Sequence, residues 1–447
     1  MTAEQGAAAG AAVTPYPPYP AYKDSGVEWL GEIPADWEVK RLKFIAPIRI
    51  SRLESKPAEG VYVGLENVES WTGRLLLDHQ PENVDSVVAS FEAGDVLFGK
   101  LRPYLAKVAR PDFTGVCTSE IVPLQPTAAC TQNYLMYCLL NEPYIRWLDS
   151  LTYGTKMPRV SPEQLAVSFL PLPGLDEQHA IAAFLDRETA RIDALVAKKE
   201  RLIELLHEKR TALITRAVTK GLDPDVPMKE SGVEWLGAIP AHWESSRMWR
   251  IGSAISGGTP TKDEPRYWGG EIPWVSPKDM KRRFIDSSED TITDQALAEA
   301  GLKLIRPPAV LIVVRGMILA HSFPVGVTRV SVTINQDMKA LRLRRDVAPW
   351  FVAWVFEGVG KVLVASVVEE AAHGTRAIRM DQWRSVTIPV PPESEQHAIA
   401  AFLDRETARI DVLIAKVRDA IERLKELRTA LISAAVTGKI DVRQEVA

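Results

Sequence analysis

The chain has 447 residues, of which 46% are hydrophobic and 25% charged, and its formal net charge is −4. This length suits two to four domains of an ordinary globular protein, and no segment reaches the 18 consecutive apolar residues typical of a membrane span. Three cysteines without paired spacing argue against a disulfide framework or a zinc site and fit a reducing cytoplasm.

The chain begins with a segment dominated by Ala, Gly and Pro. Residues 1–22 have neither the basic start nor the strong apolar stretch of a secretory signal. We therefore expect a disordered tail over 1–22 and a cytoplasmic protein.

Residues 23–174 form the first predicted body. Short runs rich in β-formers at 60–65 and 95–98, bounded by Gly and Pro, indicate strands, and residues 132–151 favour a helix. A mixed α/β domain follows, although the sequence does not fix its strand order.

A long helix is predicted over 175–220, since the segment lacks both Pro and Gly and is rich in good helix formers. Asp176 and Glu177 place negative charge at its start, and Gly221 is a natural stop. A second body over 221–392 has strand-like residues at 309–314 and a helix-like segment at 349–368. A second long helix is predicted over 393–440 with Gly438 as its stop, followed by a tail at 441–447.

Two phrases of this sequence occur twice. Residues 177–195 return as 395–413 with one change, Ala194 to Val412, and residues 23–38 return in closely similar form as 229–244. The chain is thus two copies of one unit, in which the opening and the start of the long helix are repeated and the residues between them vary. Such a chain is expected to present two different surfaces on one scaffold.

Apolar residues follow a 3-4 spacing along both long helices, which is typical of a coiled coil. The predicted seam, or partner-docking face, is Ile181, Leu185, Ile192, Leu195, Leu202, Leu206, Ile399, Leu403, Ile410, Leu413, Leu424 and Leu427. Two separate amphipathic surface helices are the alternative. The second body joins the end of one helix to the start of the other, so an antiparallel pair holding the two bodies apart is the simplest arrangement. The fold class expected is α+β with an internal pseudo-two-fold repeat.

No catalytic constellation is present in the sequence. The phosphate-loop-like stretch at 256–262 lacks the second Gly and the hydroxyl residue after its Lys, since Asp263 follows. His179 and His397 recur at matching helix positions, where packing or surface hydrogen bonding is the more ordinary role. The chain is therefore expected to be no enzyme, with no metal and no cofactor of its own.

The repeated motifs resemble the specificity subunit of type I DNA restriction-modification systems. The resemblance is carried by the openings at 31–37 and 237–243, the turns at 154–156 and 374–376, and above all the two junctions. These read Leu-Pro-Leu-Pro into Glu177-Gln178 and Ile-Pro-Val-Pro-Pro into Glu395-Gln396, each followed by Ile-x-x-Phe-Leu-Asp. Residues 256–260, 267–268 and 272–276 also look like that family's target-recognition domains.

This resemblance implies that each body reads one half of a split double-stranded DNA site and that the helices set the spacer between the halves. It also implies two methyltransferase subunits docked on the helices, with S-adenosylmethionine in those partners and ATP and Mg in a motor-nuclease (restriction) subunit. DNA methylation and phage defence would be the setting.

The candidate DNA contacts are basic or polar residues in loops, because Arg and Lys bind guanine edges or phosphates and Asn and Gln bind adenine edges. They are Lys100, Arg102, Tyr104, Lys107, Lys156, Lys278, Lys281, Arg282, Arg283, Arg315, Asn335 and Gln336. A solvated surface charge is the alternative for each of the cations. A two-headed protein-binding adaptor without DNA is the rival function.

Overall fold

The computed structural model describes residues 16–56, 60–78, 81, 84, 86–154, 156–370 and 375–446. By its internal contacts the chain divides into two compact units. Unit 1 comprises residues 1–200 and 418–447, and unit 2 comprises residues 201–417. Each unit holds one body, one end of the long helix α5 (Leu175–Lys220) and the opposite end of the long helix α10 (Glu393–Val436).

The body of unit 1 is built from small sheets. A four-stranded sheet has the order β4-β6-β9-β5 and a three-stranded sheet has the order β10-β7-β8, while β1 pairs with β2 and β3 with β11. The strands are β1 (Tyr22–Asp24), β2 (Glu32–Pro34), β3 (Glu38–Arg41), β4 (Arg52–Leu53), β5 (Tyr62–Val63), β6 (Val88–Phe91), β7 (Val96–Gly99), β8 (Val108–Ala109), β9 (Gly115–Thr118), β10 (Ile121–Leu124) and β11 (Phe169–Leu172). Its short helices are α1 (Leu42–Ile45), α2 (Gln132–Leu139), α3 (Glu142–Ser150) and α4 (Pro162–Val167), with 3₁₀ turns η1 (Leu65–Asn67), η2 (Pro103–Leu105) and η7 (Arg443–Val446).

The single helix expected over 132–151 is two helices, α2 and α3. Asn141 takes an extended conformation between them, with φ −68° and ψ 121°, and Pro143 lies in the first turn of α3. Proline suits a first turn but would clash with the carbonyl four residues earlier inside a helix. The chain therefore breaks before Pro143.

The body of unit 2 has a larger sheet, ordered β15-β22-β19-β20-β17, beside a three-stranded sheet ordered β18-β16-β21. Among the described residues three further pairs of strands form two-stranded sheets: β12 with β13, β14 with β25, and β23 with β24. The strands are β12 (Met228–Glu230), β13 (Ala238–Pro240), β14 (Glu244–Arg247), β15 (Gly252–Ser256), β16 (Trp268–Val275), β17 (Phe284–Ile285), β18 (Asp290–Ile292), β19 (Val310–Val313), β20 (Val325–Thr328), β21 (Thr333–Ile334), β22 (Met338–Leu343), β23 (Val368–Glu370), β24 (Arg376–Ile378) and β25 (Thr387–Val390). The helices are α6 (Met248–Ile251), α7 (Asp294–Glu299), α8 (Pro349–Val367) and α9 (Met380–Ser385), with 3₁₀ turns η3 (Pro265–Tyr267), η4 (Pro277–Asp279) and η5 (Met317–Ala320).

Helix α8 is the core helix of unit 2. Phe351, Trp354 and Phe356 are buried on it, and Gly358 lies so close to Ile214 and Val218 of α5 that a side chain there would press on them. Among the described helices it is the one whose length and apolar composition would suit a membrane span. Its burial against the sheet and α5 accounts for that composition.

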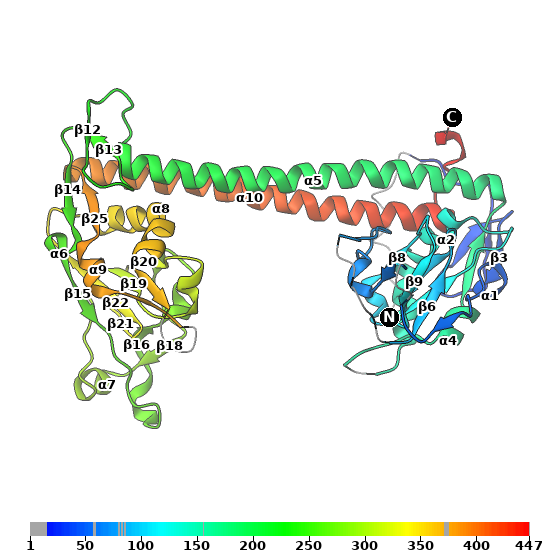
Figure 1. Cartoon of the computed structure of the whole chain (residues 1–447), viewed down its shortest axis with the longest axis horizontal. Coiled ribbons are helices and arrows are strands. Elements are labelled where there is room, and N and C mark those ends of the chain that lie inside the picture. Colours follow the sequence, from blue (N-terminus) through cyan, green and yellow to red (C-terminus); the bar gives the residue numbers. More distant parts are fainter. Residues whose placement is uncertain are drawn as a thin grey trace, which may run out of the picture. The chain divides into compact units, whose positions relative to one another are not determined.

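Helix α5 covers its predicted range and α10 ends at Val436, before the predicted end at 440, and the two helices pack together antiparallel (Figure 1). In unit 1 the first turns of α5 share a buried apolar cluster with the last turns of α10, including Ile192 and Leu431. In unit 2 the last turns of α5 share a cluster with the first turns of α10, including Ile214 and Leu403. The opposite ends meet in each unit, so the predicted antiparallel coiled coil is confirmed.

The predicted seam consists of two rows of residues along each helix, and only one of these rows is at the helix interface. Ile181, Leu185, Ile192, Ile399, Leu403 and Ile410 are buried, and Leu206 and Leu424 are half-buried. Leu195, Leu202, Leu413 and Leu427 instead lie between 39% and 49% exposed. The less exposed residues stand one position later in the chain. In α10 they are Thr407, Ile414, Ile421 and Arg428, all buried, and in α5 they are Thr189, which is buried, and Val196, Ile203 and Arg210, which are half-buried.

The prediction passed over these positions because some of them are polar, and their polar side chains can be buried since each has a hydrogen-bond partner. The hydroxyls of Thr189 and Thr407 donate to the carbonyls of Leu185 and Leu403, at 2.6 and 2.7 Å. A buried hydroxyl with such a partner is tolerated inside a seam. A spacing rule that favours leucine therefore selects the neighbouring, exposed row.

The recurring Glu-Gln of each junction fixes the start of each long helix to its body. Gln178 has no exposed surface; its Oε1 accepts from the Thr131 N–H at 2.8 Å, and its Nε2 donates to the carbonyls of Ala129 and Pro173 at 2.9 Å. Gln396 makes the same three bonds, to Ala348 N–H and to the carbonyls of Asp346 and Pro391. One amide thereby satisfies three backbone groups in each unit.

The ends of the long helices contact the recurring Trp-rich openings. Gly438 ends α10 at φ +70° against Pro34 and Trp37, and Gly221 ends α5 at φ +77° against Trp243. A left-handed conformation and a close neighbour both favour glycine here. These glycines are the stops that the sequence predicts.

The N-terminal segment differs from the expected tail. Residues 1–15 lie outside the described residues, but Tyr19 is only 6% exposed, its ring lies 5.7 Å from that of Trp37, and its hydroxyl donates to Glu177 at 2.7 Å. Asp441 and Val442 of the C-terminal segment are also packed, since Val442 is fully buried and the Asp441 N–H donates to the Pro17 carbonyl at 2.7 Å. The burial of the Tyr19 ring therefore fixes part of a segment that its Pro-rich composition predicted to be a disordered tail.

Candidate nucleic-acid interface

The first group of predicted contacts lies in the turn after β7 of unit 1. The backbone N–H of Lys100 donates to Glu120 and that of Arg102 donates to Pro158, so the turn is anchored on both sides. Arg102 takes a left-handed φ of 51°, and the side chains of Arg102 and Tyr104 are exposed. An anchored backbone with outward Arg and Tyr side chains suits contact with a polyanion.

Lys107 has a structural role in place of the predicted phosphate contact. Its Nζ donates to the carbonyls of Leu65 and Val68, both at 2.7 Å, and burial lowers the pKa of its ammonium. An ammonium held by two carbonyls inside the body is not available to a phosphate. Lys156 is exposed, but its neighbour Thr155, like Gly374 of the second predicted turn, lies outside the described residues.

In unit 2 the three consecutive cations at 281–283 divide. Lys281 and Arg282 are exposed and have no ion pair within the described part of the chain. Arg283 turns inward, with its guanidinium 3.0 Å from the centre of the Trp354 ring and paired with Glu357, and burial lowers its pKa to about 9. Arg283 is therefore a core residue rather than a DNA contact, because a group so enclosed cannot reach a duplex.

The remaining predicted contacts of unit 2 lie on different elements. Lys278 is exposed but paired with Asp290 at 2.8 Å and Glu289 at 3.3 Å, which neutralises its charge. Asn335 is 6% exposed, and its Oδ1 accepts from the backbone of Asp337. Gln336 and Arg315 are exposed, and the Gln336 amide accepts a hydrogen bond from Thr259.

The structure brings two of these residues to one hollow of about 540 Å³. Its lining is Lys262, Trp268, Trp274, Ser276, Pro277, Lys278, Asp290 and Asn335. Sequence reasoning missed Lys262 and Trp268, which together offer a cation and an indole face, the pairing that binds phosphate and base. Lys262 could have been found from the Ser-Gly-Gly-Thr-Pro-Thr-Lys loop, because residues 256–260 of that loop already resemble the family's target-recognition domains.

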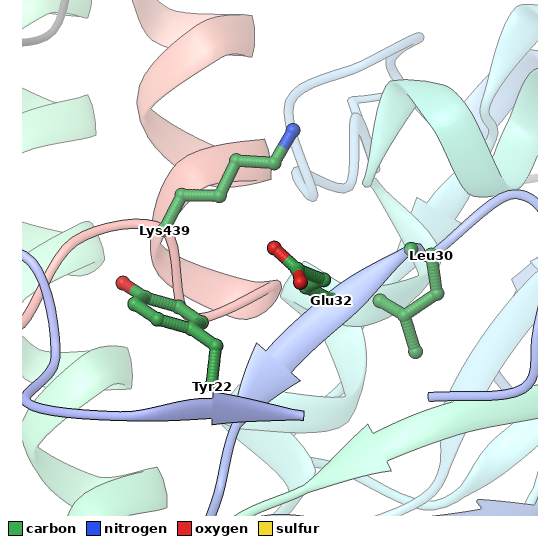
Figure 2. A pocket seen from close by; sticks show the side chains of 5 residues that line it. Tyr22, Leu30, Glu32 and Lys439 are labelled. Carbon is green, nitrogen blue, oxygen red and sulfur yellow. The ribbon is translucent and has the colours of Figure 1, made fainter. Parts of the chain in front are cut away.

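A second hollow, of about 370 Å³, lies in unit 1 where the first strands meet the end of α10 (Figure 2). Tyr22, Leu30, Gly31, Glu32 and Lys439 line it, and the Tyr22 hydroxyl donates to the Gly438 carbonyl at 3.1 Å. None of these residues is a candidate contact, so the hollow belongs to the scaffold.

The described residues contain no group of three or more His, Cys, Asp or Glu side chains arranged to hold a metal. The three cysteines are buried and free, and burial raises the pKa of Cys117 and Cys130 to about 12. His179 and His397 are exposed, and His397 lies 3.9 Å from Glu393 on its own helix.

The repeated unit found above matches a known family twice. The model for the "Type I restriction modification DNA specificity domain" matches residues 34–205 and again residues 240–423, which together are more than half of the chain. The chain therefore belongs to the type I restriction-modification DNA specificity family.

Individual relatives agree with this assignment. The chain is 30% identical over 259 residues to the EcoR124I/EcoR124II specificity subunit of Escherichia coli, covering 58% of this chain and 57% of that protein. It is 24% identical over 439 residues to the putative MjaX specificity subunit of Methanocaldococcus jannaschii, covering 93% and 96%. The chain spans 57% of the EcoR124I/EcoR124II subunit and 46% of the EcoDI subunit, less than two thirds of either relative.

Solved structures show the same fold. A chain from work on complex assembly and conformational transition of the type I R-M system aligns with a TM-score of 0.71 at 20% identity, covering 91% of this chain and 99% of that chain. The HsdS subunit from Thermoanaerobacter tengcongensis aligns with a TM-score of 0.55 at 21% identity, covering 91% and 98%.

Proposed function

We propose that this chain is the non-catalytic DNA-recognition subunit of a type I restriction-modification complex. Each body reads one half of a bipartite double-stranded site, and the paired helices set the spacer between the halves. The observation that carries the proposal is the two-fold match to a DNA specificity domain, with each copy containing one body and extending into one of the two long helices.

The bodies differ where reading would occur. Unit 1 offers Arg102 and Tyr104 on an anchored turn, whereas unit 2 offers Lys281 and Arg282 and the hollow lined by Lys262 and Trp268. Different side chains on two bodies suit two different half-sites, because base edges are read by specific hydrogen-bonding groups. The net charge of −4 fits a subunit whose partners supply further positive charge around the duplex.

The two long helices carry the same exposed side chains, as expected if a partner binds in two copies. Exposed side chains of the repeated segment are identical at equivalent positions, such as Arg187 with Arg405 and Arg191 with Arg409. Packing within the chain does not require identical outward residues. A partner that binds each helix in the same way would meet the same side chains twice, and the exposed Leu195 and Leu413 extend this face.

In this proposal the two copies are methyltransferase subunits, which hold S-adenosylmethionine, and a motor-nuclease subunit brings ATP and Mg. The residues of this chain bind and orient DNA, and the complex works in the cytoplasm.

The test is a filter-binding assay with the chain co-expressed with the methyltransferase subunits of its host. Methylome sequencing of that host with and without the gene identifies the site. Selective retention of duplexes carrying that bipartite site is expected. Indifference of the complex to DNA sequence would favour the two-headed protein adaptor instead.

A further inference from the structure

Arg428 of α10 joins three parts of unit 1. It is 8% exposed, its Nε donates to Asp193 of α5 at 3.1 Å, and its two terminal nitrogens donate to the carbonyls of Trp71 and Thr72 at 2.6 and 3.1 Å. Each of the three guanidinium nitrogens thus has an acceptor, which fixes the orientation of this buried group. Both long helices are thus tied to one loop of the body.

That loop is tied in turn to the candidate DNA-contact turn. The Trp71 N–H donates to the Ala106 carbonyl at 3.1 Å, and the Lys107 ammonium donates to the Val68 carbonyl. Trp71 and Ala106 both take left-handed φ angles, 67° and 44°, which non-glycine residues adopt only when their surroundings hold them. The segment carrying Arg102 and Tyr104 therefore depends on contacts that begin at the helices.

Arg210 of α5 does the same in unit 2. It lies 3.4 Å from Asp411 of α10 and donates to Glu357 of α8 at 2.7 Å. Glu357 also pairs with Arg283, whose guanidinium lies over Trp354. Arg283 directly follows the exposed candidate contacts Lys281 and Arg282.

The two arrangements are copies of one another. Asp411 and Arg428 stand 218 residues after Asp193 and Arg210 (411 − 193 and 428 − 210), which is also the offset of the repeated segment at 177 and 395 (395 − 177). Each Arg pairs with the equivalent Asp of the opposite helix, yet each reaches a different kind of partner in its body: two carbonyls in unit 1 and a carboxylate in unit 2. The side chains recur although the bodies they meet have diverged.

We propose that Arg428 and Arg210 are equivalent positioning residues, each of which orients the DNA-contact segment of its own unit relative to the helix pair. The proposal rests on the proposed function and adds the residues through which each half-site is read in the correct orientation. Neither side chain need touch DNA.

The experiment uses the full chain in complex with its methyltransferase subunits and four variants. Arg428→Gln and Arg210→Gln remove the guanidinium. Arg423→Gln and Arg201→Gln are matched controls. Among the described residues, the exposed Arg423 of α10 pairs with Asp419 and the exposed Arg201 of α5 pairs with Glu204 and Glu208, each on its own helix. Binding is measured to the native site and to sites with a base change in one half or the other.

For Arg428→Gln we expect discrimination in the half-site read by unit 1 to fall about tenfold, with discrimination in the other half unchanged, because one charge-assisted contact is worth about that factor. Arg210→Gln should give the reverse, and both controls should match the wild type. Arg428→Lys keeps the charge, but its single nitrogen cannot take the places of the three separate guanidinium nitrogens that now bind Asp193, Trp71 and Thr72. It should therefore show the same half-site loss if Arg428→Gln fails to fold.

Equal loss in both half-sites, or no loss in either, would overturn the positioning role while leaving DNA recognition intact. If the wild-type complex selected no bipartite site, the proposed function itself would be wrong.

Discussion

Replacing Gly438 by Ala should destabilise unit 1 much more than the equivalent change at Gly221 destabilises unit 2. Both glycines end a long helix with a positive φ, so an added Cβ costs each of them about 1–2 kcal/mol. At Gly438 the new atom would also lie 2.2 and 2.4 Å from the ring of Pro34, whereas at Gly221 the nearest atom is 3.2 Å away on Trp243. A proline ring cannot rotate aside, so overpacking adds about 1–3 kcal/mol at Gly438.

The expected totals are about 2–5 kcal/mol for Gly438→Ala and about 1–2 kcal/mol for Gly221→Ala. Hydrogen exchange followed by mass spectrometry would resolve the two units through their own peptides, and urea unfolding would give the sum. Gly174→Ala is the control, since a Cβ there meets nothing within 4 Å and the backbone needs no positive φ. An equal or larger loss at Gly221 would refute the steric argument.

Further predictions concern the buried amides, the lysines and the thiols. Gln396→Leu should destabilise unit 2 by about 2–4 kcal/mol in urea unfolding, because three backbone groups lose their partner; a loss below about 0.5 kcal/mol would contradict that role. Lys107→Gln should lower the melting temperature without changing the salt dependence of DNA binding, and Lys281→Gln should do the opposite, so identical behaviour of the two variants would count against the assignment. The three cysteines, all in unit 1, should react with a thiol reagent at pH 8 only as fast as unit 1 opens, and rapid labelling of the native chain would disprove their burial.

The long helices and their ends could be predicted from the sequence because they depend on local rules. Freedom from Pro and Gly, acidic first turns and terminal glycines all act within a few residues. The seam could be located only to within one residue, because the 3-4 spacing is met by two adjacent rows. Choosing between Leu195 and Val196 requires knowing which faces the other helix.

The candidate site was predictable only in part, since the fate of a cation depends on distant residues. Lys107 and Arg282 look alike in sequence, yet one ammonium is enclosed by the carbonyls of Leu65 and Val68 and the other side chain is exposed. Similarly, the packing of Tyr19 depends on Trp37 and on Glu177, more than 150 residues away in the chain. Such contacts are tertiary, and no local pattern reports them.

The position of α8 along the chain bears on how unit 2 forms during synthesis. A free segment as apolar as Pro349–Val367 would attract chaperones or other nascent chains. The strands that cover it, β19 and β20, and the last turns of α5 all leave the ribosome before it does. Trp383 of α9, whose ring lies 5.2 Å from that of Phe356, and the first turns of α10 are still to come, so this apolar helix emerges when only part of its packing surface is present.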